Sequence, residues 1–450
     1  MDSIAINHTT MSSGSRTADI SNMLNQLLNT LHSYRATPHQ SLYLIAFLFP
    51  SILFYLINKQ QKQKQKQQKR GSFSSNPTTT ATSEKRLLKE DREPGKWPPS
   101  SYVFPTPPPY PDWDLHKTKP LPYRPFRYGP VYHTTMGLRT IQPENWIELD
   151  NQYPKYHADK AARIAERGEK CIMVAPEAAE AAVELLRELA EYLPARYPSL
   201  FRRTATGMID NLWSGESFDI SWLATGTGTG DTGSKSKAVE QEQEKQGRKA
   251  LEIAARLVQD DLVLMVEQPD DQYYLLAGAV SCCLASGGSP TNSACRWRNC
   301  TLRGLRPEQM VGRNNHFIQV DDALPWSWSI GSEDGKDDTE PSWSTAEQNR
   351  AIEHHYFRSE RQTLRRLPKT GAICFTVRTY FEPITAIAEE DYVPGRLASA
   401  VRSWGDDVAR YKGKERYGEV LLGFLDKKHQ EQMERGLDPS KEDDCQAYPF

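Results

Sequence analysis

Apolar residues form one long block near the N-terminus of the chain. It runs from Ser41 to Ile57 without a charge, a length at the short end of the roughly 17–25 residues that a membrane-spanning helix needs. A buried core helix would need a covering domain, yet neither flank has the periodicity of one, and a cleaved signal peptide would not follow so long a polar stretch. We therefore expect a transmembrane helix at 41–58, after a disordered tail at 1–40.

Shorter apolar patterns further along the chain predict helices and strands. Between Pro176 and Leu193, apolar residues recur at i, i+3, i+4 spacing after a proline, which is typical of an amphipathic helix. Three runs rich in β-branched and aromatic residues predict strands at 262–266, 273–280 and 372–380. Helices on either side of a meander of strands predict an α+β domain with an antiparallel sheet and flanking helices.

Polar and proline-rich stretches separate these patterns. From 59 to 120 the chain is basic and then rich in Ser, Thr and Pro, which predicts a linker without a packed core. A Thr/Gly-rich and then Gln/Glu/Lys-rich stretch at 225–249 predicts a surface loop that interrupts the domain. We therefore expect a domain at 121–430 with this low-complexity insert, followed by a C-terminal tail at 431–450.

The overall composition excludes some classes of protein. With 56 Lys and Arg against 58 Asp and Glu, a net charge of −2 and 38% hydrophobic residues, the chain is neither a basic nucleic-acid-coating protein nor a polytopic membrane protein. We expect no nucleic acid partner. Its seven Cys include no CxxC pair and form neither a disulfide framework nor a zinc site. No Walker, HExxH or GxSxG motif supports a P-loop nucleotide site, a zinc protease or a serine hydrolase.

A basic tract at 59–70 follows the predicted membrane span directly, whereas only Arg35 lies close before it. By the positive-inside rule, the bulk of the chain then lies in the cytosol. We expect a single-pass membrane protein of the endoplasmic reticulum or another endomembrane, with a cytosolic C-terminal domain. The tract could also be a solvated spacer or a contact for anionic lipids, and both are compatible with anchoring.

Several unusual motifs follow one another between Leu121 and Lys428. They are Pro122-Tyr-Arg-Pro-Phe-Arg-Tyr-Gly-Pro130, Trp146-Ile-Glu-Leu-Asp150, Arg256-Leu-Val-Gln-Asp-Asp-Leu262, Gly312-Arg-Asn-Asn-His-Phe-Ile-Gln319 and Arg358-Ser-Glu-Arg-Gln-Thr-Leu-Arg-Arg-Leu-Pro368. In this order they resemble the haem-dependent oxidative N-demethylase family, whose bacterial members include a dimethylamine monooxygenase subunit. The Arg-x-Glu-Arg-Gln-Thr-Leu-x-Arg-Leu-Pro block is the most specific of them.

The resemblance implies a PAS-like α+β domain that binds haem b and takes electrons from a separate flavin or iron–sulfur reductase. With O₂ it would hydroxylate an N-methyl group of a small amine, and the group would leave as formaldehyde. Arginines are permanently charged and grip carboxylates with two hydrogen bonds, so they suit the haem propionates. The candidates are Arg313, Arg358, Arg361, Arg365, Arg366 and Arg378. The alternative is an internal ion-pair network of these arginines with Glu360 around a helix start.

The family's segment for the axial histidine is missing from the printed frame. In the family, a Lys-(Leu/Ile)-Gly-x-x-Leu-x-x-(Ile/Leu)-His pattern lies between the strand at 273–280 and the Arg-Asn-Asn motif. This chain instead reads Ser289-Pro-Thr-Asn-Ser-Ala-Cys-Arg-Trp-Arg-Asn-Cys-Thr-Leu-Arg303. Reading each codon's third base with the next two permits Lys-Leu-Gly-Leu-Pro-Leu-Ala-Glu-Leu-His, so that the axial histidine is lost near Cys300 and Thr301. Our hypothesis is that residues 288–306 come from a frameshifted or misspliced reading of the gene.

In the printed frame another residue would have to bind the haem iron. His316, beside the Arg-Asn-Asn motif, is the first candidate, followed by His354 and His355 and then by His133 and His157. Cysteines in or beside apolar runs are less suited, because a thiol there is usually inert packing. These cysteines are Cys282, Cys283 and Cys374.

Two other functions compete with that of a monooxygenase. A haem-binding sensor or a non-catalytic subunit would share a PAS-like fold, since a fold does not fix an activity. A product of a faulty gene reading that lacks the axial histidine would be inactive. A Soret absorption band separates the inactive chain from the others, and reductase-dependent formaldehyde release separates the enzyme from the sensor.

Overall fold

A computed structural model describes residues 92–126, 129, 137–224, 237–280, 300–331, 333, 343–438 and 440–441. All of them belong to one compact unit, Lys85–Phe450. The predicted tail at 1–40 and the predicted membrane helix at 41–58 lie outside the described residues. Among the helices that the structure does describe, none is long and apolar enough to cross a bilayer.

A large antiparallel sheet forms the centre of the described region. Its strands run in the order β1-β8-β9-β10-β6-β7-β2, and each neighbouring pair is antiparallel. These strands are β1 (Arg139–Thr140), β2 (Ile172–Val174), β6 (Asp261–Glu267), β7 (Tyr273–Ala279), β8 (Val311–Gln319), β9 (Tyr356–Arg366) and β10 (Ile373–Pro383). A second, smaller sheet consists of β3 (Phe201–Arg203), β4 (Met208–Asn211) and β5 (Ser217–Asp219).

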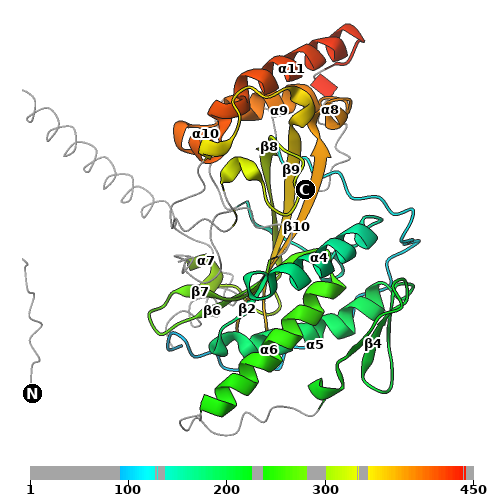
Figure 1. Cartoon of the computed structure of the whole chain (residues 1–450), viewed down its shortest axis with the longest axis vertical. Coiled ribbons are helices and arrows are strands. Elements are labelled where there is room, and N and C mark those ends of the chain that lie inside the picture. The colour runs from blue at the N-terminus through cyan, green and yellow to red at the C-terminus, as the bar shows by residue number, and fades with distance from the viewer. Residues whose placement is uncertain are drawn as a thin grey trace, which may run out of the picture. The chain divides into compact units, whose positions relative to one another are not determined.

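Helices flank the large sheet at both ends. They are α4 (Tyr153–Arg167), α5 (Ala179–Arg196), α6 (Lys237–Leu257), α7 (Cys300–Arg303), α8 (Ile384–Ile387), α9 (Val393–Arg402), α10 (Asp406–Tyr411) and α11 (Lys414–Glu434). Short 3-10 turns lie at Pro143–Asn145, Gly168–Lys170, Pro176–Ala178, Ser221–Leu223, Trp328–Ile330, Trp343–Thr345 and Ile352–His354. Figure 1 shows α4, α5 and α6 around one end of the long β9–β10 hairpin and α9, α10 and α11 around the other.

The pleat of β9 sends alternate side chains to two faces of the sheet. Ser359, Arg361, Thr363 and Arg365 share one face, here called face A, with Cys374 of β10, which is paired with Arg365. Apolar residues of α5 and α6 cover face A at one end of the hairpin. Residues of α8, α9 and α11 cover it at the other end.

The opposite face of the sheet, face B, carries Arg358, Glu360, Gln362, Leu364 and Arg366 of β9. Its apolar part packs against Tyr156 of α4, residues of and after α7, and Leu324 in the chain that follows β8. The buried cluster on this side includes Val263, Met265, Leu302, Leu305, Leu324, Leu364, Ile373, Phe375 and Val377. The two faces therefore differ in what lies over them, and every candidate residue on a strand belongs to one or the other.

The predicted α+β content with an antiparallel sheet and flanking helices is confirmed. The amphipathic pattern at 176–193 forms α5, after a 3-10 turn over its first residues. The three predicted strands are β6, β7 and β10, each within a few residues of its expected bounds. The PAS-like assignment stays a prediction.

The linker prediction for 59–120 is wrong for its last part, 92–120. Phe104 and Trp113 pack against the core beneath face A, and the Trp97 indole donates a hydrogen bond to the Pro368 carbonyl at 3.3 Å. The proline content correctly indicates extended chain. It says nothing about the aromatic side chains between the prolines, and their burial fixes this segment on the domain.

Three further expectations need correction. The low-complexity insert at 225–249 is not a loop throughout, because α6 begins at Lys237; Gln, Glu and Lys are good helix formers and lead into the apolar stripe that ends this helix. The Arg-x-Glu-Arg block does not lie around a helix start but forms β9. Arginines lie on both faces of this strand, so its sequence lacks the alternation of apolar and polar residues from which a strand is usually predicted. At the other end of the domain, α11 continues to Glu434, into the predicted tail.

Candidate functional site

The motif at 146–150 lies along face A and turns its acidic residues toward the sheet. Glu148 Oε1 lies 3.0 Å from Arg361 Nε, and the hydroxyls of Tyr123 and Tyr380 donate hydrogen bonds to the same carboxylate. Burial alone would lower the pKa of Arg361, but Glu148, together with Tyr123, Tyr380 and Asp260, raises it above its ordinary value. Arg361 is therefore bound to a carboxylate of its own chain.

Asp150, two residues further along, holds Arg378 in the same way. Its Oδ2 lies 2.8 Å from Arg378 Nη2, and its Oδ1 accepts a hydrogen bond from Gln259 Nε2 at 3.1 Å. The guanidinium of Arg378 is fully buried and lies 4.1 Å and 4.6 Å from the ring centroids of Tyr156 and Tyr380. Ion pair and ring stacking together account for this buried charge.

Arg365 completes a row of three arginines on face A. Its Nη2 lies 2.6 Å from Glu188 Oε2 of α5, and its guanidinium stacks over the rings of Phe104 and Trp146. Burial raises the pKa of Glu188 to about 7, although Arg365 opposes the shift. All three arginines are thus ion-paired within the chain, but with Glu148, Asp150 and Glu188 and not with Glu360 as the alternative expected. A role in binding haem propionates stays a prediction for them.

Two candidate arginines on face B are also engaged by the protein. Arg358 Nη1 donates hydrogen bonds to Gln319 Oε1 at 3.2 Å and to the Leu324 carbonyl at 3.0 Å, and Arg358 Nε lies 3.8 Å from Glu360 Oε1. Arg366 binds backbone carbonyls around α7. The sequence cannot distinguish these two from the arginines on face A, because the distinction depends on strand parity.

Arg313 differs from the other candidates. It lies on β8 opposite Gln362 and therefore on face B. Its Nε is buried and has no hydrogen-bond partner among the described residues. A guanidinium in this state can still pair with a carboxylate that the described protein does not supply.

A buried charge cluster surrounds this arginine. Glu360 accepts a hydrogen bond from Gln362 Nε2 at 2.9 Å, and burial raises its pKa against the opposing effect of Arg358. Lys412 interacts electrostatically with Glu360 and Arg313, and burial lowers its pKa to about 8. The cations of the cluster outnumber its carboxylate, so this part of face B favours an anionic group. No sequence signal marks Lys412, which lies in the turn after α10.

His316 lies on the opposite face from Arg313. It is buried, its ring stacks on Phe357 at 5.5 Å, and the rings of Phe126 and Trp404 lie 6.0 Å away. Its Nε2 has no hydrogen-bond partner in the described part of the chain. Burial holds the pKa of His316 well below its ordinary range, so the imidazole is neutral. It is the one described histidine on a strand of the large sheet, and it belongs to face A.

The other proposed iron ligands are placed elsewhere or lie outside the described residues. His355 is buried beside Tyr417, and its Nδ1 donates to a backbone carbonyl at 3.1 Å. His157 bonds the Arg256 carbonyl and the Glu216 carboxylate. His354 is exposed, and burial raises the pKa of Cys374 to about 12. The residues outside the description are His133, Cys282 and Cys283.

The expected position of the family's axial histidine falls at the start of a helix. Cys300 and Thr301 are the first two residues of α7, and the stretch before them, 281–299, lies outside the described residues. Neither Cys300 nor Thr301 is a histidine in the printed frame, and a threonine is not among the usual ligands of haem iron. The loss of the axial histidine near Cys300 and Thr301 stays a prediction, at a position that directly precedes the buried Leu302.

The described residues of face B meet one requirement of a haem site and lack another. Face B offers Arg313, with a buried donor atom that lacks a partner, and a local excess of positive charge for carboxylates. No histidine on the described strands shares that face. The described part of face B therefore offers positive charge for carboxylates, with no histidine beside it on the described strands.

Two further buried groups have no simple sequence signal. Arg124, in the first motif, is bound by Glu382 at 2.7 Å and by Glu390 at 2.5 Å, which fixes that segment to β10 and the chain before α9. Asp260 is fully buried, neither of its carboxylate oxygens has a hydrogen-bond partner among the described residues, and burial raises its pKa to about 6. Arg361 is the strongest of the neighbouring cations that oppose this shift.

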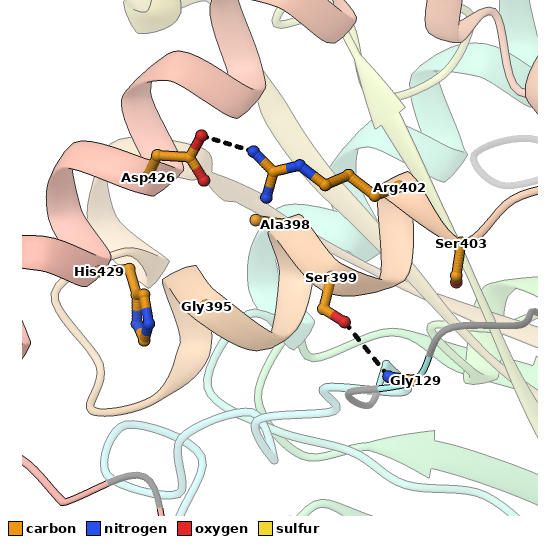
Figure 2. A pocket seen from close by; sticks show the side chains of 8 residues that line it. All are labelled: Gly129, Gly395, Ala398, Ser399, Arg402, Ser403, Asp426 and His429. Carbon is orange, nitrogen blue, oxygen red and sulfur yellow. Dashed lines mark hydrogen bonds and ion pairs between the residues drawn. The ribbon is translucent and has the colours of Figure 1, made fainter.

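A small cavity of about 360 Å³ lies between α9 and α11, at the low end of the size range of small-molecule pockets. Figure 2 shows Arg402 paired with Asp426 across it, at 2.5 Å, and Ser399 turned toward Gly129. His429 completes its polar lining. These helices cover face A, so the cavity is separate from the cluster around Arg313.

A family comparison matches the arrangement of motifs found above. The chain matches the family described as haem-dependent oxidative N-demethylase, alpha subunit-like, over residues 137–293 and 296–422. These segments cover more than half of the 450 residues and include the motif at 146–150 and all of β8, β9 and β10. The break in the match falls inside 288–306, the stretch in which the family pattern is missing. The chain therefore belongs to the haem-dependent oxidative N-demethylase, alpha subunit-like family.

Proposed function

We propose that this protein is the haem-binding component of a monooxygenase that removes methyl groups from small amines. Family membership supports a haem-dependent, oxidative N-demethylase-like activity. The finer parts of the proposal are haem b as the cofactor, O₂ as the oxidant and a small N-methyl amine as the substrate. A PAS-like topology belongs to the same proposal.

The single observation that supports a haem site is the state of Arg313. Among the described residues it forms no ion pair with a carboxylate, whereas Arg361, Arg365 and Arg378 are each paired with one; a buried Nε without a hydrogen-bond partner is a feature that Arg313 shares with Arg365 and Arg378. We therefore place the haem propionates on face B at Arg313, with Lys412 contributing a second positive charge. The apolar residues on the same face, such as Phe375, would exclude water from the remainder of the group.

The chain's own residues would bind and orient the cofactor rather than perform the chemistry. When bound, haem would supply the oxidising chemistry, and the methyl carbon would leave as formaldehyde. Arg313 would hold a propionate with charge-assisted hydrogen bonds, and the buried face would keep the site dry. The axial ligand is expected in the connection between β7 and β8, where the family pattern has its histidine.

The proposal also includes the electron donor and the cellular location of the protein. No flavin or iron–sulfur motif was found in the sequence, so we propose a separate flavin or iron–sulfur reductase as the partner. The uncharged block at 41–57 and the basic tract at 59–70 support a single N-terminal membrane anchor with the domain in the cytosol, in the endoplasmic reticulum or another endomembrane. Such an anchor would hold the domain close to a membrane-bound reductase.

The test begins with an absorption spectrum of the full chain purified with added haemin. A Soret band in a stoichiometric complex, weakened by Arg313→Gln and kept by Arg402→Gln, is the expected result. Arg402 is the matched control because it is an arginine paired at the surface, away from face B. Formaldehyde release from methylated amines with NADPH and a reductase then separates the enzyme from a haem sensor. Absence of a Soret band would favour the inactive product of a faulty gene reading.

A further inference from the structure

We infer that Arg366 is a positioning residue that fixes the end of the β7–β8 connection on face B. The sequence groups it with the propionate-binding arginines. Its contacts assign it a different role, because Arg366 Nε donates to the Leu305 carbonyl at 2.7 Å and Nη2 donates to the Leu302 carbonyl at 2.7 Å. Both carbonyls belong to the end of α7 and the turn after it, where the connection from β7 reaches the sheet.

The guanidinium of Arg366 uses nearly all of its hydrogen-bond donors. Nη2 also donates to the Tyr273 hydroxyl at 2.8 Å, and Nη1 donates to the Gly371 carbonyl at 2.5 Å. An arginine has five N–H donors, and four of those of Arg366 are used. One remaining donor cannot make the two-pronged contact with a carboxylate for which arginines are chosen at propionates.

All four of these hydrogen bonds go to neutral oxygens. Arg366 is fully buried, and burial lowers its pKa, although the Tyr273 hydroxyl opposes the shift. Its guanidinium lies over the ring of Trp97 at 4.3 Å. A buried charge is costly to desolvate, so the retained arginine is best explained by what it holds: two carbonyls of α7 and its following turn, the start of β7 through Tyr273, and the β9–β10 turn through Gly371.

The hydrogen bonds of Arg366, here called the clamp, join these three segments at the end of the β7–β8 connection. Leu302 and Leu305, whose carbonyls it holds, are buried in the apolar cluster of face B. The consequence for the cofactor rests on the proposed function: a ligand supplied by the β7–β8 connection can keep a fixed position only if the end of that connection is fixed. Outer partners of this kind typically change affinity for a bound metal about 10–100-fold when they are removed.

Hydrogen exchange of the full chain tests the clamp, with Arg366→Lys compared with Arg365→Lys. The two residues are adjacent on β9, fully buried and on opposite faces, so global destabilisation affects both variants. We expect the Leu305 amide, which bonds the Leu302 carbonyl at 3.1 Å, to exchange at least about tenfold faster in Arg366→Lys than in Arg365→Lys. Tyr273→Phe removes a single acceptor and should show a smaller increase, which provides a readout if Arg366→Lys does not fold.

Equal exchange at Leu305 in the two lysine variants, or no increase in Tyr273→Phe, would overturn the inference. Titration with haemin gives the second readout: Arg366→Lys should weaken haem binding about 10–100-fold and shift the Soret maximum, whereas Arg365→Lys should keep its position. If the wild-type chain shows no Soret band, the proposed function fails while the exchange result still decides whether Arg366 is a clamp. A Soret band unchanged in Arg366→Lys would reject the link to haem.

Discussion

At the scale of single residues, the motifs that indicate the family are largely devices that hold the domain together. Glu148 and Asp150 are separated by one residue because each must reach a different arginine across a strand-like segment. The sequence suggested an ion-pair network of the arginines with Glu360, and it did not single out Glu148 and Asp150 as partners. It could not assign partners, because Arg361 and Arg313 look alike until strand parity places them on opposite faces.

The Asp150–Arg378 pair should be among the most sensitive ion pairs of the domain. Both side chains are almost completely buried, so Asp150→Asn leaves a guanidinium without its counter-charge and should lower the free energy of unfolding by about 3–5 kcal/mol. Asp426→Asn breaks the half-exposed Arg402–Asp426 pair and should change it by less than about 1 kcal/mol. Urea unfolding followed by circular dichroism measures both. Similar losses in the two variants would contradict the assignment.

Asp260, unlike Asp150, should lower the stability of the domain at neutral pH. Burial raises its pKa from 3.8 to about 6, so the folded state binds a proton more tightly than the unfolded state. The stability that this group contributes is complete below about pH 4 and is lost as pH rises to about 6. Asp260→Asn should then raise the free energy of unfolding at pH 7, by about 3 kcal/mol, and flatten its dependence between about pH 4 and 6. A less stable variant at pH 7 would show that neighbouring cations stabilise the ionised form.

For His316, the role suggested by the sequence differs from the surroundings found in the structure. It was the first iron-ligand candidate because it adjoins the Arg-Asn-Asn motif, but its ring lies among Phe126, Phe357 and Trp404 on face A. Its Nε2 lacks a partner among the described residues, so His316→Phe removes no described hydrogen bond of that atom and replaces one aromatic ring of the cluster by an apolar one. We expect unchanged haem binding in an absorption titration and a free energy of unfolding within about 1 kcal/mol of wild type. Loss of the Soret band in a folded variant would restore His316 as the ligand.

At the scale of elements, the sequence predicts the apolar strands well and the polar ones badly. β6 and β10 are rich in β-branched residues, whereas β9 is a row of charged and polar residues whose burial depends on partners far away in the chain. The start of α6 was missed because its first turns are low in complexity, although their Gln, Glu and Lys residues are good helix formers. Local composition contains no information on the distant partners that bury β9.

Gly247 tests that helix contact. An added Cβ would lie 2.7 Å from the Ala179 Cα at the start of α5, so Gly247→Ala should destabilise the domain by about 1–3 kcal/mol, although alanine is the better helix former by about 1 kcal/mol. Gly423 of α11 has open space around its Cβ position, and Gly423→Ala should stabilise by up to about 1 kcal/mol. Thermal unfolding of the pair gives opposite shifts in Tm if α5 and α6 cross closely. A rise in Tm for both would exclude the close crossing.

At the scale of the whole molecule, the stretch at 288–306 departs from the family pattern that the sequence on either side of it follows. The family match breaks between 293 and 296, in the same stretch where the printed frame lacks the axial-histidine pattern. By Leu302 and Leu305 the chain is again part of the core on face B and is held there by Arg366. We therefore expect the frameshifted reading to end by Thr301, within the interval 288–306.

We predict that the transcript encodes a different peptide across this interval. Reading the codons of 291–301 one step further permits a Lys-Leu-Gly pattern that ends in histidine at Cys300 and Thr301, immediately ahead of the clamped carbonyls. Sequencing of the mRNA should reveal a junction or an inserted base between the codons of Gly288 and Leu302. A chain made from that mRNA should bind haem more tightly than the printed chain, by the intensity of the Soret band per mole, and should lose that gain when the restored histidine is changed to alanine. An mRNA that encodes Asn299 and Cys300 in the printed frame, without an alternative junction, would reject the hypothesis, and the iron ligand would then have to be sought among the described histidines.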